Sequence, residues 1–242
     1  MCGPTRSRER EMEFLFKLKA RSINQSANET NAHRIMLHCY DVTSQAMHFD
    51  PHWLSVIQDA PAWMSRAERL MMFTLAFSLR PRRYIEIGTL QGGSALLVCS
   101  ALDALESDAK MYLVDPAPKI TPENKERLRH RATLYEGHSP EILKVVAGEA
   151  GGSFDLVLID GDHSYKGVMR DAEGILPYVE PGGYIVFHDS FYEDVRRAID
   201  DFVARHSGRV LDLGILTREF TSQKVNNKIV KWGGLRLVQV IS

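Results

Sequence analysis

The chain has 242 residues, of which 44% are hydrophobic and 25% charged, and its formal net charge at pH 7 is −1. This length and composition are typical of one large globular domain, or of a domain with a small appendage. The near-zero net charge gives no support to nucleic acid or an anionic membrane as a partner. The three cysteines, Cys2, Cys39 and Cys99, form no C-x-x-C pair, which disfavours a disulfide framework and a structural zinc site.

The beginning of the chain carries no targeting signal that we can identify. Its first ten residues are charged and polar, and no apolar segment behind them is long enough for a signal peptide. The most apolar window, residues 70–79, is about half as long as a membrane-spanning helix must be. We therefore expect a cytoplasmic protein with no membrane partner.

Residues 1–62 show no alternation of strands and helices. Helical spacing covers residues 11–19 and 32–46, and Asp50-Pro51 begins a further short helix. We predict a helical appendage over residues 1–62, which covers the active-site face or makes a dimer contact. The main domain is then residues 63–242. It begins with a capping box, Ser65 to Glu68, which opens a buried helix over residues 67–79.

Strands and helices alternate from Tyr84 onward. Five βα units are followed by two β-like segments, which a polar stretch at 217–231 joins. This order predicts an α/β fold with a doubly wound, Rossmann-like, seven-stranded sheet that ends in an antiparallel β-hairpin. The predicted strands are 84–87, 110–114, 132–135, 154–159, 184–187, 210–216 and 235–241, and the predicted helices between them are 93–105, 122–130, 140–147, 165–178 and 193–206.

The stretch 84–94 reads as a buried strand, a glycine turn and the start of a helix. Such a unit places helix N–H groups at the carboxyl end of a sheet, where nucleotide-like ligands bind. The G-x-G-x-x-G spacing of dinucleotide-binding proteins is absent. The spacing E-x-G-x-x-x-G-x-S instead resembles motif I of the class I S-adenosylmethionine (SAM)-dependent methyltransferases, whose cationic cofactor suits an acid at the strand end; a generic βα turn is the alternative. The predicted cofactor-binding residues of this turn are Glu86, Gly88, Thr89, Gly92 and Ser94.

Two further positions are predicted to contact the cofactor. Asp115 follows the second strand, where a carboxylate can accept hydrogen bonds from a ribose diol. The methyltransferase motif II has an acid there, although Asp115 could also be a loop acid or helix cap before Pro116. His138 and Ser139 follow the third strand and resemble the place where the family contacts adenine, or Ser139 simply caps the next helix.

Acids and histidines gather after the fourth and fifth strands. Asp160, Asp162 and His163 follow one strand, and His188 and Asp189 follow the next. Because neighbouring parallel strands lie about 5 Å apart, these groups are expected in one crevice, where the acids repel one another unless they share a cation or proton. Carboxylates suit Mg²⁺, and an imidazole adds affinity for Mn²⁺, Fe²⁺ or Zn²⁺. The pattern therefore predicts a divalent metal.

The segments I-D-G-D-H-S-Y-K-G-V and P-G-G-Y-I-V-F-H-D resemble one branch of the class I methyltransferases, over about residues 63–242. The branch includes cephalosporin-hydroxylase-type and macrolide- or aminocoumarin-sugar O-methyltransferases and is related to the catechol-type enzymes. The resemblance implies an antiparallel last strand inserted into the sheet, and a metal held by Asp160, His188 and Asp189, with Asp160 also beside the cofactor. Catechol-type members carry Asp-Asn where this chain has His-Asp, which leaves the metal open. The base position maps to Asp162 or His163.

We therefore predict a SAM-dependent O-methyltransferase for a small hydroxylated metabolite, assisted by a divalent metal, Mg²⁺ foremost, and assembled as a homodimer or larger. A metal bound by two neighbouring oxygens would favour vicinal diols. A second hypothesis is an oxidoreductase or hydroxylase: the missing glycine motif argues against a nicotinamide cofactor, but His163, His188 and Asp160 could hold iron. A third is a non-catalytic methyltransferase-like protein, against which the intact set of acids argues.

Overall fold

The computed structural model describes residues 50–225 and 227–242, so the helices expected at 11–19 and 32–46 lie outside the described residues. The extent of the predicted appendage, residues 1–62, stays a prediction. The helices are η3 (Pro51–Ser55), α2 (Val56–Asp59), α3 (Arg66–Leu79), α4 (Gly93–Ala104), α5 (Pro122–Leu128), α6 (Leu143–Ala150), α7 (Tyr165–Ile175), η4 (Leu176–Tyr178) and α8 (Glu193–Arg205). The strands are β1 (Arg83–Ile87), β2 (Lys110–Asp115), β3 (Ala132–Glu136), β4 (Phe154–Ile159), β5 (Val179–Phe187), β6 (Val210–Ile215), β7 (Thr221–Val225), β8 (Lys228–Trp232) and β9 (Arg236–Val240).

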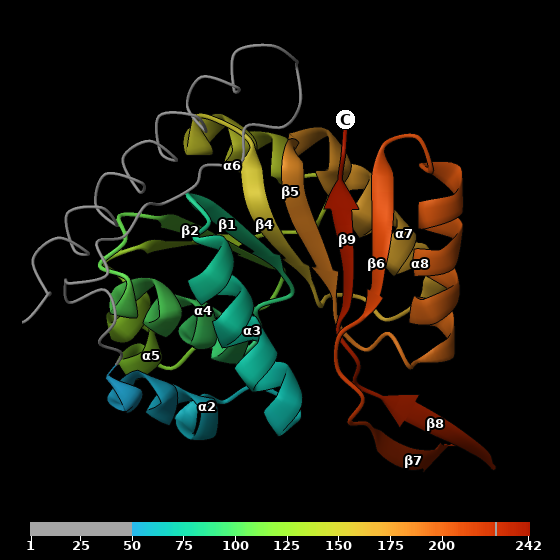
Figure 1. Cartoon of the computed structure of the whole chain (residues 1–242), viewed down its shortest axis with the longest axis horizontal. Coiled ribbons are helices and arrows are strands. Elements are labelled where there is room, and N and C mark those ends of the chain that lie inside the picture. Colours follow the sequence, from blue (N-terminus) through green and yellow to red (C-terminus); the bar gives the residue numbers. More distant parts are fainter. Residues whose placement is uncertain (1–49, 226) are drawn as a thin grey trace, which may run out of the picture. The chain divides into compact units, whose positions relative to one another are not determined.

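Seven strands form one sheet in the order β3-β2-β1-β4-β5-β9-β6 (Figure 1). β1 to β5 pair in parallel, whereas β9 is antiparallel to both β5 and β6. The predicted doubly wound sheet and the antiparallel insertion of its last strand are confirmed. Because the order reverses between β1 and β4, the carboxyl ends of these strands border a crevice that can take a ligand.

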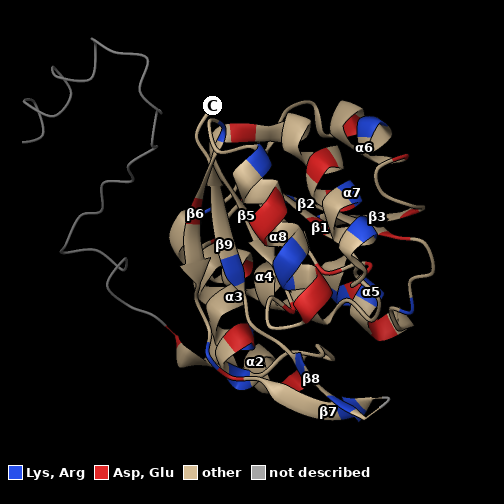
Figure 2. Cartoon of the chain, turned by 90° about the vertical axis from the view of Figure 1, so that its right-hand side faces the viewer, with Lys and Arg blue, Asp and Glu red and all other residues tan. Residues whose placement is uncertain are grey.

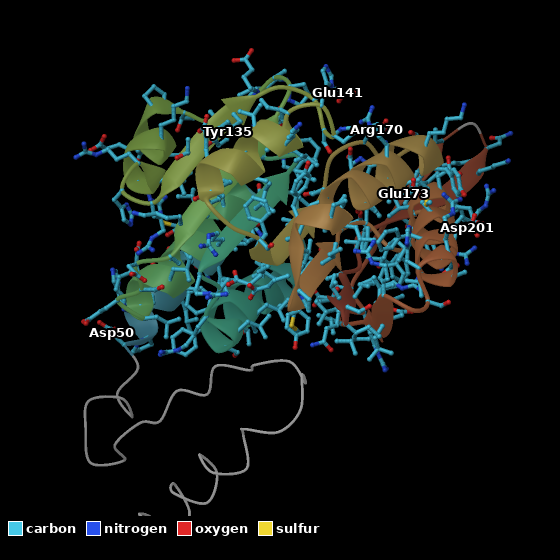
Figure 3. The ribbon with its side chains drawn as sticks, turned by 90° about the horizontal axis from the view of Figure 1, so that it is seen from above. Asp50, Tyr135, Glu141, Arg170, Glu173 and Asp201 are labelled. Carbon is cyan, nitrogen blue, oxygen red and sulfur yellow. The ribbon has the colours of Figure 1, made fainter. Side chains whose placement is uncertain are left out.

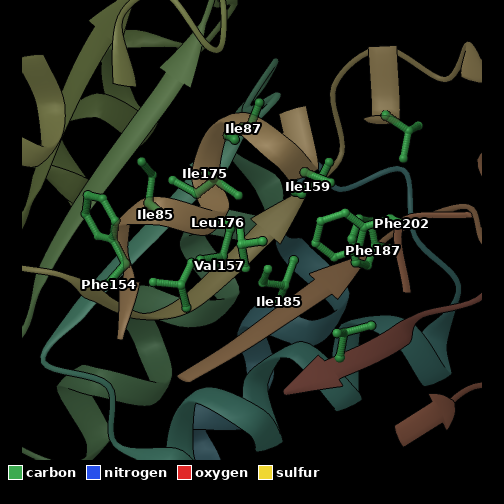
Figure 4. Packing of buried hydrophobic residues seen from close by; sticks show 14 of the residues in the cluster. Ile85, Ile87, Phe154, Val157, Ile159, Ile175, Leu176, Ile185, Phe187 and Phe202 are labelled. Atoms are coloured by element: carbon green, nitrogen blue, oxygen red, sulfur yellow. The ribbon is translucent and has the colours of Figure 1, made fainter. Parts of the chain in front are cut away.

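Helices cover the sheet on both faces and bury one apolar cluster on each. One cluster packs the strands against α6, α7 and α8, and its residues include Val157, Ile175 and Phe202 (Figure 4). The other packs them against α2 to α5. The strands carry apolar side chains on both faces, as strands covered on both sides do. This packing holds the strand ends, and therefore the site, in fixed positions.

Polar contacts join the outer sides of α7 and α8. The Tyr165 hydroxyl donates to Asp201 Oδ2 at 2.6 Å, and Arg205 donates to Glu173; Glu173 and Asp201 are labelled in Figure 3. Acidic and basic residues both lie along α8 (Figure 2), where Arg196 pairs with Glu193 and Asp200. Opposite charges three and four residues apart form a solvated helix face.

The structure corrects three expectations about the elements. The polar stretch at 217–231 contains a second hairpin, β7–β8, which forms its own two-stranded sheet. β7 is mostly polar and fully exposed, and β8, with the sequence Lys-Ile-Val-Lys-Trp, is mostly exposed. Neither strand shows the apolar alternation that marks a half-buried strand. The helix expected over 140–147 begins at Leu143. β5 begins at Val179, five residues before the predicted start, because residues 181–183 continue the strand through an irregular register.

Candidate functional site

A cavity of about 860 Å³ opens where β1 to β5 end. This volume is within the range of small-molecule and cofactor sites. Its walls come from the loops after these strands, from the segment before α3, from α7 and from the β7–β8 hairpin. The predicted site residues that line it are Gly88, Thr89, Ser94, Asp115, His138, Ser139, Asp160, Asp162, His163, His188 and Asp189.

The glycine turn after β1 lies directly against the end of β4. Gly88 has a φ of +91°, and a Cβ atom built on it would come within 2.2 Å of the Asp160 carbonyl oxygen. Only glycine fits such an approach. Gly92, with a φ of +76°, precedes the first residue of α4 and does not line the cavity, whereas Gly93 does. The turn therefore presents backbone to the cavity, as predicted, but through Gly93 rather than Gly92.

Glu86 lies behind the cavity wall. It is fully buried, it does not line the cavity, and its carboxylate accepts hydrogen bonds from the Tyr84 hydroxyl at 2.7 Å and from Ser94 Oγ at 2.8 Å. Burial raises the pKa of Glu86 to about 7, although these hydroxyls oppose the rise. This geometry does not support the expected direct contact with a cofactor cation. Glu86 instead connects β1 to the first turn of α4.

Asp115 lies at the end of β2 with its carboxylate at the cavity. Oδ2 accepts the Leu90 N–H at 2.8 Å and Oδ1 accepts the Ala117 N–H at 2.7 Å. His138 and Ser139 line the neighbouring wall after β3. Asp171 on α7 lines the same wall, is 1% exposed, and has its pKa raised to about 6 by burial. Sequence reasoning missed Asp171, because an acid inside an amphipathic helix is usually a solvated one.

The predicted metal-binding groups meet on the other side of the cavity. One donor atom each from Asp160, His163, His188 and Asp189 lies within 4.8 Å of every other. His188 Nδ1 is 2.9 Å from Asp160 Oδ1 and 3.2 Å from Asp189 Oδ2, and His163 Nε2 is 2.8 Å from Asp189 Oδ2. Two carboxylates and two imidazoles form a donor set that fits a divalent cation such as Mg²⁺ or Mn²⁺.

The four groups share charge in their present arrangement. Hydrogen bonds to Asp160 and Asp189 raise the pKa of His163 to about 9. Burial lowers the pKa of His188, but the carboxylates of Asp160, Asp189 and Glu68 outweigh burial and hold that pKa well above its usual value. The imidazolium groups in turn hold the pKa of Asp160 and of Asp189 below the usual range, against the effect of burial. Protons on the histidines therefore supply the positive charge that the acids require.

Of the two candidate bases, His163 faces the cluster and Asp162 does not. Asp162 is exposed, and its Oδ1 accepts the Ser164 N–H at 2.8 Å in the turn that begins α7. The ring of His163 lies edge-on to Trp232, with 5.6 Å between centroids. Trp232 also stacks flat on Tyr192 at 4.5 Å.

The β7–β8 hairpin adds Thr221, Gln223 and Trp232 to the cavity wall. Trp63 also lines the cavity; it is 83% exposed and donates from Nε1 to Gln91 Oε1 at 3.3 Å. Sequence reasoning missed the hairpin residues. The polar composition of 217–231 contains no signal that would place them near strands β4 and β5.

Glu68 is a further acid that sequence reasoning assigned only to a helix cap. It is 1% exposed, and its Oε1 lies 3.4 Å from His188 Nε2, on the side of the imidazole that faces away from Asp160. A second group of possible metal donors, Cys99, Asp103 and His130, lies elsewhere. There, the Arg131 guanidinium donates twice to Asp103 and already supplies a positive charge.

Comparison with known proteins identifies the domain. Residues 85–190 match the family described as methyltransferase domain, and these residues span the glycine turn and all four possible metal ligands of the cavity. This match covers less than half of the chain. Together with the sheet order, it agrees with the class I SAM-dependent methyltransferase family predicted from the motifs.

Solved structures share the fold of the methyltransferase domain. The O-methyltransferase TomG from Streptomyces achromogenes, in complex with SAM, is 19% identical, with a TM-score of 0.57 over 84% of this chain and 96% of that one. An O-methyltransferase from Bacillus cereus, in complex with SAH, is 21% identical, with a TM-score of 0.57 over 80% of this chain and 93% of that one. At these identities the likeness establishes the fold.

Two curated relatives match in sequence, and both are described as uncharacterized. One, from Sinorhizobium fredii, is 27% identical over 72% of this chain and 19% of its own length. The other, from Acanthamoeba polyphaga mimivirus, is 28% identical over 47% of this chain and 52% of its own length. The chain thus spans about a fifth and about half of these relatives. Within the described residues, no helix combines the length and apolar character needed to cross a bilayer.

Proposed function

We propose that this methyltransferase transfers the methyl group of SAM to a hydroxyl group of a small molecule, with the help of a divalent metal. The observation that carries the proposal is the cluster of Asp160, His163, His188 and Asp189 in the same cavity as the glycine turn. Methyl transfer needs two reactants held in line at close range, and one cavity that joins a cofactor wall to a cation site can hold both.

The cofactor occupies the side formed by the ends of β1, β2 and β3. The Asp115 carboxylate accepts two backbone N–H groups and keeps lone pairs for the ribose hydroxyls. His138, Ser139 and the buried Asp171 border the place of the adenine, and Gly88 and Gly93 let the cofactor approach the backbone. Ser94, which Glu86 fixes through its Oγ, completes this wall.

The acceptor occupies the side formed by the ends of β4 and β5 and by the hairpin. Asp160, His188 and Asp189 would hold the metal, as the family resemblance implies. A bound divalent metal would lower the pKa of a hydroxyl and orient it. A vicinal diol suits such a site, because its two adjacent oxygens could both bind the metal. The rings of Trp232 and Trp63, which both line the cavity, suit a flat or ring-shaped acceptor.

His163 is the base in this proposal. Asp162 is engaged in the turn before α7, whereas His163 Nε2 lies in the cluster. The imidazole can accept a proton only when it is neutral, and its pKa of about 9 reflects the two carboxylates beside it. Positive charge bound between these carboxylates would lower that pKa toward neutrality, where a general base works best.

Calorimetry tests the proposal directly. The chain is titrated with SAM, SAH and NADP, each with and without a chelator. We expect SAM and SAH to bind in both conditions and NADP in neither. SAH formation with a panel of vicinal-diol acceptors should require added Mg²⁺ or Mn²⁺. A chain that binds neither adenosyl ligand would contradict the proposal. Turnover that survives the chelator would contradict the role of the metal.

The proposal extends to assembly and location. We expect a homodimer or larger in the cytoplasm, with no nucleic acid partner. Leu211, Leu213 and Ile215 on the edge strand β6 are 50%, 45% and 43% exposed, and an exposed apolar edge of this kind is typical of a surface that another chain covers. Light scattering coupled to size-exclusion chromatography gives the mass in solution, and a monomer at micromolar concentration would contradict this part.

A further inference from the structure

Glu68 serves three partners with one buried carboxylate. In the first turn of α3, its Oε2 accepts the Ser65 N–H at 2.7 Å. Its Oε1 accepts the Gly234 N–H, at the link between the hairpin and β9, and faces His188 Nε2 at 3.4 Å. A carboxylate that is 1% exposed needs such partners, because an unpaired buried charge is costly. The two carboxylate oxygens therefore have different roles: Oε2 accepts the N–H at the helix cap, and Oε1 faces His188 in the site.

His188 places its two ring nitrogens toward opposite sides. Nδ1 faces Asp160 and Asp189, which are the other proposed metal ligands. Nε2 is buried and has no hydrogen bond of good geometry within the described residues, and Glu68 Oε1 is the acceptor that faces it. An imidazole that binds a metal through one nitrogen carries its hydrogen on the other, and an acceptor there fixes the ring and its tautomer.

We propose that Glu68 is a positioning residue of the metal site: it accepts the Nε2–H of His188 and so directs the Nδ1 lone pair toward a cation between Asp160 and Asp189. This inference rests on the proposed function, since it assumes that His188 is a ligand. Because the same carboxylate holds Gly234, it also fixes the base of the hairpin that carries Trp232 to the cavity. A role in the capping box alone would need only Oε2.

Two variants of the full chain separate these roles. Glu68→Gln removes the charge and keeps one oxygen that can accept. Ser65→Ala is the matched control: it removes the Oγ that accepts the Glu68 N–H at 3.3 Å, and leaves the carboxylate in place. Mn²⁺ binding is measured by calorimetry, SAM binding likewise, and stability by thermal unfolding. We expect Glu68→Gln to weaken Mn²⁺ binding by roughly 10-fold or more, with SAM binding unchanged. Ser65→Ala should lower the Tm and leave Mn²⁺ binding unchanged.

A second measurement needs no variant. Long-range ¹H–¹⁵N spectra of the unaltered chain saturated with Mg²⁺ report the His188 tautomer, which we expect to carry its hydrogen on Nε2. The opposite tautomer would overturn the inference, even if Glu68→Gln does not fold. Unchanged Mn²⁺ binding by Glu68→Gln, or an equal loss in Ser65→Ala, would also overturn it. If the unaltered chain binds SAM but no Mn²⁺, the metal part of the proposed function fails, and the inference fails with it.

Discussion

The two sides of the cavity are built from the same sheet edge by different means. The proposed cofactor side, at the ends of β1, β2 and β3, consists largely of backbone and of two carboxylates: Asp115, which accepts backbone N–H groups, and the buried Asp171. The acceptor side, at the ends of β4 and β5, holds four ionisable groups within 4.8 Å of one another. The first side can be read as a binding surface with little charge to rearrange. The second side holds carboxylates and histidines with perturbed pKa values, and a bound ligand or cation can shift the protons among them. It is therefore the side where we expect proton transfer and catalysis.

The largest effect expected from this comparison concerns Asp160. Asp160→Ala removes an acid that contacts both histidines of the cluster. We expect turnover, measured as SAH formation with the best diol acceptor, to fall on the order of 10³-fold, because both the metal and the base lose a partner. SAM affinity, measured by calorimetry, should change only a few-fold. A larger loss of SAM affinity than of turnover would contradict the assignment of Asp160 to the acceptor side.

The next prediction concerns Glu86, which is fully buried and does not line the cavity. Its folded pKa of about 7 exceeds the usual carboxyl value, so the protonated form favours folding at low pH. This stability is present below about pH 4.5 and is lost as the pH rises through about 7, on the order of 3 kcal/mol in all.

Glu86→Gln should remove this pH dependence, because the amide does not ionise. Urea unfolding at pH 5, 6, 7 and 8 measures the free energy of unfolding of both proteins. As the pH rises, we expect the free energy of unfolding of the variant to increase relative to that of the unaltered chain. Parallel pH profiles would contradict the buried, titrating carboxylate.

The third prediction tests whether Asp115 contributes to SAM binding. Asp115→Ala removes the acceptor for the ribose hydroxyls and should weaken SAM binding on the order of 10- to 100-fold, the value of one or two charged hydrogen bonds. Mn²⁺ binding should stay unchanged. Asp115→Asn keeps one acceptor oxygen, so its SAM affinity should lie between those of the unaltered chain and of Asp115→Ala. Equal SAM affinity in all three proteins would exclude Asp115 from the cofactor site.

The smallest effect concerns the hairpin. Trp232→Ala removes a ring that packs against His163 and Tyr192, and we expect the acceptor KM to rise about 5- to 10-fold, the value of one aromatic contact. Ile229→Ala, on the same hairpin at a side chain that is 75% exposed, is the matched control and should leave KM unchanged. An equal change in both would assign the effect to the hairpin's folding rather than to the contact.

Local sequence patterns predict the alternating strands and helices and the positions of most site residues. Strands of apolar residues have a period that can be read directly, and Gly88, Asp115, Asp160 and Asp189 follow such strands. The topology of a parallel sheet then brings all strand ends to one edge, so local patterns sufficed to place both sides of the cavity.

The packing of distant segments sets what each side chain faces. Glu86 belongs to the motif but lies behind the cavity wall, and Glu68 belongs to a capping box but reaches His188, 120 positions along the chain. Gln223 and Trp232 come to the site on a hairpin whose two strands, among the described residues, pair with each other and not with the main sheet. Contacts between distant segments leave no period in the sequence, because burial and direction depend on what packs against each residue and not on its neighbours in the chain.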